Sequence, residues 1–330
     1  MLGYSVRRIL QVIPVVFLAI SLLFMLFYVL PGDPVDMLSG GQGREIPEVQ
    51  RQNIEERLGL DKPVLVQFKD YWVGVIQGDL GNSYRNDRPV IDTVKRYAPN
   101  SVRLAFWALM IEVVIGIGVG IISAVKRYSV LDTFTTLGTT VAMAIPVFVT
   151  GYVLIYIFGI RAYQQDWPEW LSFSTGGTPQ NWVLFLFPAD QESFDRLVLP
   201  AVALAFVGVA VIARMTRATM LETTSADYVR TARAKGLSEP VITFRHGLRN
   251  ALIPVVTLIG LDFGTMIGSA VLTEFVFSYN GLGSAIVSAA ATRDAPLVLG
   301  LSLFVVIVYL VVNLIVDLSY GFLDPRVRYD

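Results

Sequence analysis

The sequence predicts an all-α membrane protein with about six transmembrane helices. Of its 330 residues, 54% are hydrophobic and only 16% are charged, whereas a soluble domain carries about 25% charged residues. The apolar residues gather in runs of about 20, the length that a helix needs to cross the hydrocarbon core of a bilayer. A helix is expected because lipid offers the backbone no hydrogen-bond partners.

Six apolar runs meet this length requirement. They lie at Ile9–Leu30, Val102–Ala124, Thr133–Phe158, Leu197–Met215, Ala251–Thr273 and Leu297–Tyr320. The first run exceeds the roughly 7–15 apolar residues of a signal peptide, and no small-residue cleavage site follows it, so we expect an uncleaved first helix. Pro146 is expected to kink the third span. The run Trp182–Phe187 is too short to span and is expected to pack within an outer loop.

Basic residues in the short loops predict that both termini are cytoplasmic. The basic residues that support this orientation are Arg7, Arg8, Lys126, Arg127, Arg217, Arg230, Arg233, Lys235, Arg245, Arg249, Arg326 and Arg328. We therefore expect a single transmembrane domain over residues 1–330. Residues 31–101 form an extracytoplasmic insertion between the first two helices, and residues 216–250 form a cytoplasmic loop. Within the insertion, Ile46–Leu60 is expected to form a helix that stops at Gly59.

Composition excludes several classes of function. The chain has no cysteine and only one histidine, His246, so neither a cysteine-zinc site nor a multi-histidine metal site is expected. Net charge is −1, which argues against nucleic-acid binding. The phosphate-binding Gly-x-x-x-x-Gly-Lys-Ser/Thr motif is absent, as are His-Glu-x-x-His and Gly-x-Ser-x-Gly. No catalytic residue, metal or cofactor is predicted, and the chain is not expected to be an enzyme.

The loop between the fourth and fifth spans has the pattern of two short helices joined by a sharp turn. Thr224 and Asp227 are spaced as in a capping box. Gly236 suits a left-handed helix stop, with Leu237 packing back on the first helix. Ser238 is then expected to cap a second helix. On these residues alone, a basic interfacial helix resting on anionic lipid is as good an interpretation as a protein-docking element.

The order of residues in this loop resembles a known family. Asp227–Gly236, followed by His246-Gly-Leu-Arg-Asn250, resembles the coupling motif of ATP-binding-cassette importer permeases. Arg230-Thr231-Ala232 stands where the general motif has Glu-Ala-Ala, and Gly236 matches its glycine. The resemblance implies that this segment seats in a groove of an ATPase subunit. The ATPase-coupling residues that it implies are Asp227, Tyr228, Arg230, Thr231, Ala232, Arg233, Lys235, Gly236 and Leu237.

Further segments narrow the resemblance to the B-type permease of dipeptide and oligopeptide importers. They are Pro31–Pro34, Gly78–Ser83, Glu274–Ser278, Gly281–Gly283 and Asp324–Arg326. The resemblance implies a prokaryotic cell membrane, a second homologous permease subunit, two ATPase subunits and an extracytoplasmic substrate-binding protein. It leaves the cargo open among dipeptides, oligopeptides, nickel complexes, glutathione and other small solutes.

Three acidic residues lie within predicted spans, where charge is costly and often functional. Glu112 and Asp262 are candidates for the translocation pathway because a peptide carries an ammonium group. A packing role is equally compatible with the sequence. Packing is the favoured role for the third acid, Asp317.

Small residues also recur within the spans. Gly116, Gly118 and Gly120 lie in the second span, and Gly260, Gly264 and Gly268 lie in the fifth. Such rows permit close helix contact. The main rival from another class is an ATP-independent secondary transporter, which often contains inverted repeats. The sequence shows no such repeat.

Overall fold

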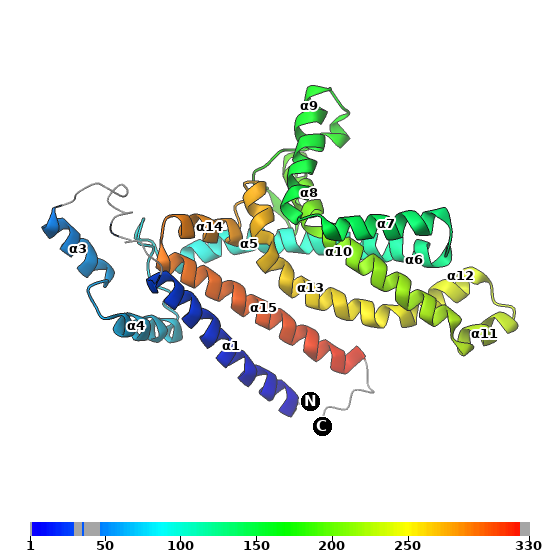
Figure 1. The fold of residues 1–330 in the computed structure, drawn as a ribbon, viewed down its shortest axis with the longest axis horizontal. Helices are drawn as coiled ribbons and strands as arrows, with labels where there is room; N and C mark the ends of the chain where they lie inside the picture. Colours follow the sequence, from blue (N-terminus) through cyan, green and yellow to red (C-terminus); the bar gives the residue numbers. More distant parts are fainter. Residues whose placement is uncertain (1, 30–34, 36–46, 324–330) are drawn as a thin grey trace. The chain divides into compact units, whose positions relative to one another are not determined.

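The computed structural model describes residues 2–29, 35 and 47–323, with the side chains at 2–9, 12, 28–29, 57–58 and 317–323 left out. The motifs Pro31–Pro34 and Asp324–Arg326 lie outside the described residues, as do the side chains of Arg7, Arg8 and Asp317. The described chain is predominantly helical (Figure 1). It divides into two compact units, Met1–Asn100 with Asn280–Leu310 and Ser101–Tyr279 with Val311–Asp330.

The first unit contains six of the labelled helices in whole or in part. They are α1 (Leu2–Val29), α3 (Glu48–Leu58), α4 (Val64–Gln77), the start of α5 (Val90–Ile111), α14 (Leu282–Ala291) and most of α15 (Ala295–Leu323). Aromatic rings join α1 to α4, with the Phe24 and Phe68 centroids 5.2 Å apart. A second apolar cluster joins α5, α14 and α15 and includes Val90, Leu282 and Leu301, all almost fully buried.

The motif Gly78–Ser83 forms the turn after α4. The backbone N–H of Gly81 donates to Asp79 Oδ1 at 2.8 Å, and the N–H of Val90 donates to the Gly81 carbonyl at 3.0 Å. Ser83 Oγ donates to Asp294, which lies between α14 and α15. The motif therefore ties the turn after α4 to the start of α15. The helix α3 ends at Gly59, as the sequence predicts.

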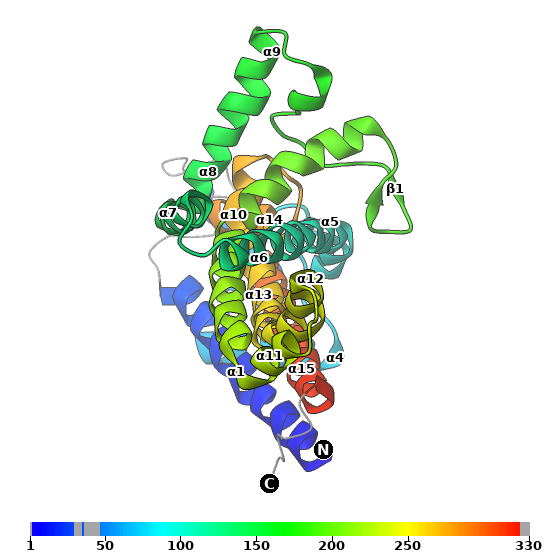
Figure 2. The same cartoon turned by 90° about the vertical axis from the view of Figure 1, so that its right-hand side faces the viewer.

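The second unit is built around α10 (Gln191–Ser225). This helix lies beside α13 (Arg249–Val276) and also contacts α6 (Ile117–Val125) and α7 (Val130–Ala144) (Figures 1 and 2). The π-helical segment η1 (Glu112–Gly116) joins α5 to α6 without a break.

Glycines allow η1 and α6 to approach α10 closely. A Cβ added at Gly116 would lie 2.8 Å from the Ile212 side chain, and one at Gly120 would lie 2.5 Å from Thr216. The predicted packing role is therefore confirmed for these two positions. An added Cβ at Gly118 would meet nothing within 4 Å of the described chain.

The fifth-span row shows the same division. A Cβ at Gly260 would lie 2.8 Å from Val316 of α15, whereas one at Gly268 would meet nothing within 4 Å of the described residues. Gly264 is buried. Part of this row therefore packs within the chain, and part faces outward.

The third predicted span is not one helix. The helix α7 ends at Ala144, and α8 (Val147–Leu154) starts after Pro146 and leaves in a different direction (Figures 1 and 2). Ile145 is extended, with φ −90° and ψ 123°, because the proline ring disfavours the helical region for the residue before it. The expected kink is thus a complete break. Beyond α8 the chain continues through the π-helical η2 (Ile155–Arg161), α9 (Ala162–Gln164) and the 3₁₀ turn η3 (Glu169–Leu171).

The short run Trp182–Phe187 forms a β-hairpin in the loop between η3 and α10. Strands β1 (Trp182–Val183) and β2 (Phe187–Pro188) pair antiparallel, with Trp182 opposite Pro188. The α5 side chains anchor this hairpin, since Arg103 Nε donates to the Phe185 carbonyl and Trp107 Nε1 to the Leu186 carbonyl, both at 2.7 Å. The run is too short to span, as predicted, and it adds a small sheet to an otherwise helical description.

Five helical stretches among the described residues are long and apolar enough to cross a membrane. They are Val90–Val125, Val147–Gln164, Gln191–Ser225, Glu239–Val276 and Ala295–Val316. In α1 the described apolar stretch, Ile13–Phe27, is shorter than these five. These helices agree with an all-α membrane protein.

Candidate coupling segment and membrane-embedded charges

The coupling segment, residues 227–248, consists of α11 (Asp227–Ala234), α12 (Glu239–Val241) and the π-helical η4 (Ile242–Leu248). The predicted capping box at its start is wrong. The helix α10 continues through Thr224, whose hydroxyl donates to the Met220 carbonyl at 2.7 Å. A hydroxyl inside a helix commonly makes this bond four residues back. The residue before α11 is Ala226, which is extended and has no capping side chain.

The turn after α11 contains the predicted left-handed glycine, whereas Leu237, which is expected to pack back on α11, is 41% exposed. Gly236 has a φ of +79°, a conformation that side chains with a Cβ disfavour. Its N–H donates to the Arg233 carbonyl at 2.9 Å, and the N–H of Leu237 reaches the Ala232 carbonyl at 3.4 Å. These two bonds define a Schellman motif. Ser238 precedes α12 as predicted, but its side chain makes no capping bond.

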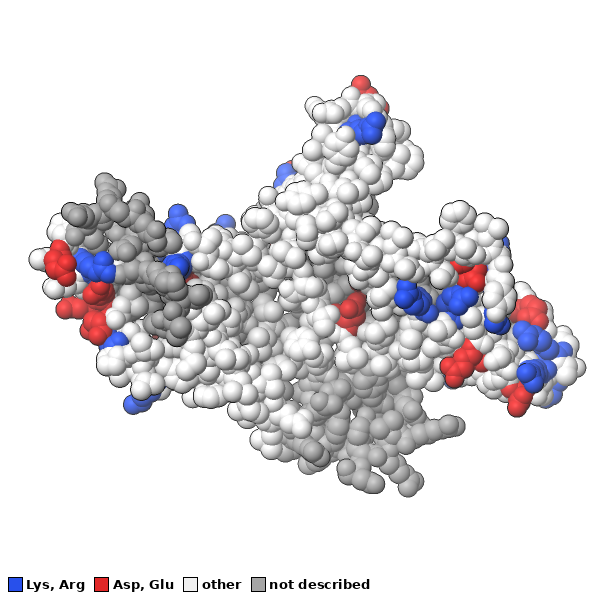
Figure 3. All heavy atoms as spheres, viewed as in Figure 1, with Lys and Arg blue, Asp and Glu red and all other residues white. Residues whose placement is uncertain are grey.

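A small apolar cluster holds the two arms of this segment together. Val229, Ala232 and Ile242 are buried against one another. Ala232 therefore faces inward and positions α11. The other residues implied by the resemblance are exposed and form the outer face of the segment: Asp227, Tyr228, Arg230, Thr231, Arg233, Lys235, Gly236 and Leu237. In Figure 3, charged atoms gather at the end of the unit that carries α11 and α12.

The basic residues of the outer face differ in their partners. Arg233 forms an ion pair with Glu239 at 2.8 Å across the turn, and this hydrogen bond raises the pKa of Arg233. Arg230 approaches Asp227 at 3.6 Å, with both side chains largely exposed. Within the described chain Lys235 makes no ion pair. Arg233 therefore stabilises the turn, while the exposed side chains of Arg230 and Lys235 are accessible to a partner.

Tyr228 and Asn250 connect the coupling segment to α13. The Asn250 side-chain amide donates to the Tyr228 hydroxyl at 3.0 Å and also lies 3.4 Å from the His246 carbonyl. The motif residues His246 and Asn250 thus meet α11 in space. This contact joins the two stretches on which the resemblance rests.

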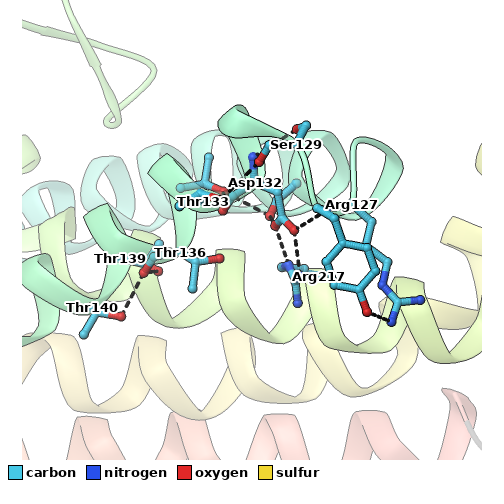
Figure 4. Close-up of polar contacts among 11 residues, drawn as sticks. Arg127, Ser129, Asp132, Thr133, Thr136, Thr139, Thr140 and Arg217 are labelled. Atoms are coloured by element: carbon cyan, nitrogen blue, oxygen red, sulfur yellow. Dashed lines mark hydrogen bonds and ion pairs between the residues drawn. The ribbon is translucent and has the colours of Figure 1, made fainter.

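An ion pair that sequence reasoning missed links α7 to α10 (Figure 4). Arg217 Nε and Nη2 donate to the two Asp132 oxygens at 2.7 and 2.9 Å. Ser123 Oγ donates to Asp132 Oδ1 at 2.5 Å, and the Tyr128 N–H donates to Oδ2 at 2.9 Å. Arg217, Ser123 and Tyr128 together hold the pKa of Asp132 well below its usual range. We call this arrangement the Asp132–Arg217 clamp.

One sequence signal could have pointed to Asp132. Ser129 caps α7 by accepting the N–H of Asp132 at 3.3 Å, and Ser-x-x-Asp before an apolar run is a helix-start pattern. The partner Arg217 lies 85 residues away, so the sequence gives no direct indication of the pair.

Glu112 and Asp262, the two candidate pathway acids, come together in the structure. Glu112 is 1% exposed, and its carboxyl interacts with that of Asp262 on α13. A Cβ added at Gly208 would overlap the Glu112 carboxyl. The glycine therefore provides the space in which Glu112 lies between α10 and α13, while Asp262 is partly exposed. Asp262 alone of the two can meet a solute directly.

The motif Glu274–Ser278 forms a buried turn at the end of α13. Glu274 is fully buried, and its carboxylate accepts a 2.5 Å hydrogen bond from Ser101 Oγ. Its backbone carbonyl accepts the N–H of Tyr279 at 2.8 Å, and the Phe277 carbonyl accepts the N–H of Gly177 at 2.9 Å. These bonds give the motif a structural role, since they join α5, α13 and the loop that contains Gly177.

Comparison with known proteins identifies relatives along the whole chain. Residues 116–329 match the model of the family described as binding-protein-dependent transport system inner membrane component, and residues 1–105 match the model of its N-terminal region. The chain is 36% identical over 336 residues to the dipeptide transport system permease protein DppB of Alkalihalophilus pseudofirmus, with 100% of both chains covered. It is 37% identical to the di/tripeptide permease DppB of Pseudomonas aeruginosa, covering 100% of this chain and 99% of the relative. It is 36% identical to the glutathione permease GsiC of Escherichia coli, with 100% of both chains covered.

Proposed function

Because the chain belongs to the family of binding-protein-dependent transport system inner membrane components, we propose that it is the permease subunit of an ATP-binding-cassette importer for dipeptides and oligopeptides. It is a multi-pass protein of the prokaryotic cell membrane, and ATP is hydrolysed by separate subunits. The proposal rests on the sequence identity of 36% and 37% to two peptide permeases, which extends over the whole chain. A glutathione permease is nearly as similar, and glutathione is itself a tripeptide.

The proposed topology has six spans, with α1 as the first and both termini in the cytoplasm. The basic residues of the loops support it. The chain contains no cysteine. A single introduced cysteine therefore shows on which side of the membrane its position lies. Thiols introduced by Lys62→Cys and Lys235→Cys should react with an impermeant reagent from the outer and the cytoplasmic side, respectively. Reaction of both from one side would contradict the topology.

The proposed partners are a second, homologous permease, two ATPase subunits and an extracytoplasmic binding protein. In this mechanism the outer face of the coupling segment docks on an ATPase, with Arg230 and Lys235 available to acidic groups. ATP drives transport because it binds one arrangement of the ATPases better than another, and the docked helix passes this preference to the spans. The rigid Schellman turn and the Arg233–Glu239 pair support this role, because a flexible loop could not transmit the displacement.

The proposed pathway passes Asp262, with Glu112 behind it, between this chain and the second permease. A partly exposed carboxyl within a spanning helix suits the ammonium group of a peptide. Asp262→Asn, which retains the side-chain shape, should lower peptide uptake while leaving ATP hydrolysis without substrate unchanged. Unaltered uptake would assign Asp262 to packing.

Purification from the native host tests the function as a whole. ATPase subunits, a second permease and a binding protein should accompany the tagged chain. After reconstitution, ATP should drive uptake of a radiolabelled dipeptide, whereas a nickel chelate should compete poorly. An isolated homo-oligomer that transports without ATP would instead establish a secondary transporter. Uptake of nickel complexes but not of peptides would reassign the cargo.

A further inference from the structure

A polar groove lies between α6, α7 and α10 at the end of the unit near the Asp132–Arg217 clamp. It has a volume of about 350 Å³, and its lining includes Ser123, Thr136, Thr139, Thr140, Arg214 and Arg217. The α7 threonines lie along one helix, one and two turns beyond Asp132 (Figure 4). Hydroxyl groups and two guanidinium groups thus share one depression in a segment otherwise rich in apolar residues.

The two guanidinium groups in this groove are not equivalent. Arg217 is held by both oxygens of Asp132, so its charge is compensated. Arg214 is exposed, and it donates to Thr140 Oγ1 at 3.2 Å. Within the part of the chain that the structure describes, no carboxylate lies within ion-pair distance of Arg214. The groove therefore carries a net positive charge at Arg214, and a hydroxyl holds the guanidinium at its rim.

We infer that this groove binds a carboxylate of the transported solute, with Arg214 as its guanidinium partner. A guanidinium presents a planar set of N–H donors that matches the two oxygens of a carboxylate. An uncompensated charge in a spanning helix marks a functional site by default. The inference rests on the proposed function, because dipeptides, longer peptides and glutathione all carry a free carboxylate.

Several residues around Arg214 fit this role. Thr140 lies beside the guanidinium, and Thr136 and Thr139 extend the row of hydroxyls along α7. The clamp fixes α7 against α10, so the spacing between the threonines and Arg214 is set before a solute arrives. A phospholipid phosphate offers the same oxyanion chemistry, and a test must separate these two sources.

The absence of cysteine from the chain makes thiol protection the most direct test. Thr136→Cys places a reporter thiol at the groove. Thr133→Cys places a matched thiol on the same helix at an exposed position outside the groove lining. Whole transporter, in vesicles that expose the cytoplasmic face, is treated with an impermeant thiol reagent, and labelling of this chain is read on a gel. The added solutes are a dipeptide, the same dipeptide with an amidated carboxyl terminus, and inorganic phosphate.

Free dipeptide should slow labelling of Thr136→Cys several-fold and leave Thr133→Cys unchanged. The amidated dipeptide should protect little. Protection should disappear with Arg214→Gln and return in part with Arg214→Lys, which retains the charge. Equal protection by inorganic phosphate would reduce the site to a general oxyanion site and overturn the assignment to the solute.

Two further results would also overturn the inference. Labelling only by a lipid-soluble reagent would place the groove against lipid and assign Arg214 to phospholipid phosphate. Full labelling in the presence of dipeptide would show that no solute binds there. The same vesicles are assayed for ATP-driven dipeptide uptake. Uptake without protection refutes the groove alone, whereas absence of uptake refutes the proposed function.

Discussion

The close contact between Gly208 and Glu112 predicts a sharp response to one added methyl group. In Gly208→Ala the new Cβ would overlap the Glu112 carboxyl. Glu112 is almost fully buried, so it has no open space into which to move. Overpacking of this kind costs about 1–3 kcal/mol. Alanine is otherwise the better helix former by about 1 kcal/mol, and the net loss should therefore lie in the lower part of that range.

Gly118→Ala is the matched control, because a Cβ there meets nothing within 4 Å of the described chain. It should leave stability unchanged or raise it. The decisive variant is Glu112→Ala with Gly208→Ala, in which the added methyl group enters space that the carboxyl has left. The double variant should be more stable than the sum of the single changes predicts, with a coupling of about 0.5–3 kcal/mol.

The assay is thermal unfolding of the purified transporter, followed by the loss of monodisperse protein. A change of 1 kcal/mol shifts Tm by about 2–4 °C in domains of 150–250 residues. Gly208→Ala should lower Tm by a few degrees relative to Gly118→Ala. Equal Tm values for the two single variants, or strict additivity in the double variant, would refute the packing argument.

Two other predictions concern the clamp and the turn. Asp132→Asn should lower Tm, and because the pKa of Asp132 is depressed, its stabilisation is complete above the ordinary carboxyl pKa of about 3.9 and is lost as pH falls. The Tm difference from wild type should thus be equal at about pH 6 and about pH 8 and shrink below about pH 4; a difference that changes between the two higher values would contradict this reasoning. Gly236→Val should abolish most dipeptide-stimulated ATP hydrolysis by straining the +79° turn, whereas Gly236→Asn should retain it because asparagine tolerates this conformation. Equal activity in both variants would remove the turn from the coupling mechanism.

Local backbone features were predictable from the sequence, and features that depend on packing were not. Gly59 and Gly236 end helices as expected, because a left-handed stop depends on one residue and its neighbours. The predicted helix start at Thr224 is wrong, because α10 continues through this residue and contacts η4. The break at Pro146 was expected only as a kink. Whether a helix resumes its direction after a proline depends on tertiary contacts that the local sequence does not contain.

The candidate site divides in the same way. The order of motif residues predicted which segment forms the exposed coupling face. It did not predict that Ala232 is buried or that Arg233 pairs with Glu239. Glu112 and Asp262 were each noticed as costly charges, yet their meeting could not be inferred because they lie on different helices. An ion pair such as Asp132–Arg217 can be identified only from the tertiary structure, because its residues are 85 positions apart in the sequence.

These contacts bear on the proposed route by which a displacement at the coupling segment would reach the spans. The helix α10 is continuous from Gln191 to Ser225 and is held at successive levels by the Glu112 carboxyl, by the glycine face of α6 and by the Asp132–Arg217 clamp. A helix restrained along its length resists local bending, so α6, α7 and α10 must move together. The joint between α10 and α11 is the extended residue Ala226, with φ −69° and ψ 152°. In the proposed mechanism, the preference of the ATPases for one arrangement enters the membrane through this joint, and the clamp then determines which helices follow α10.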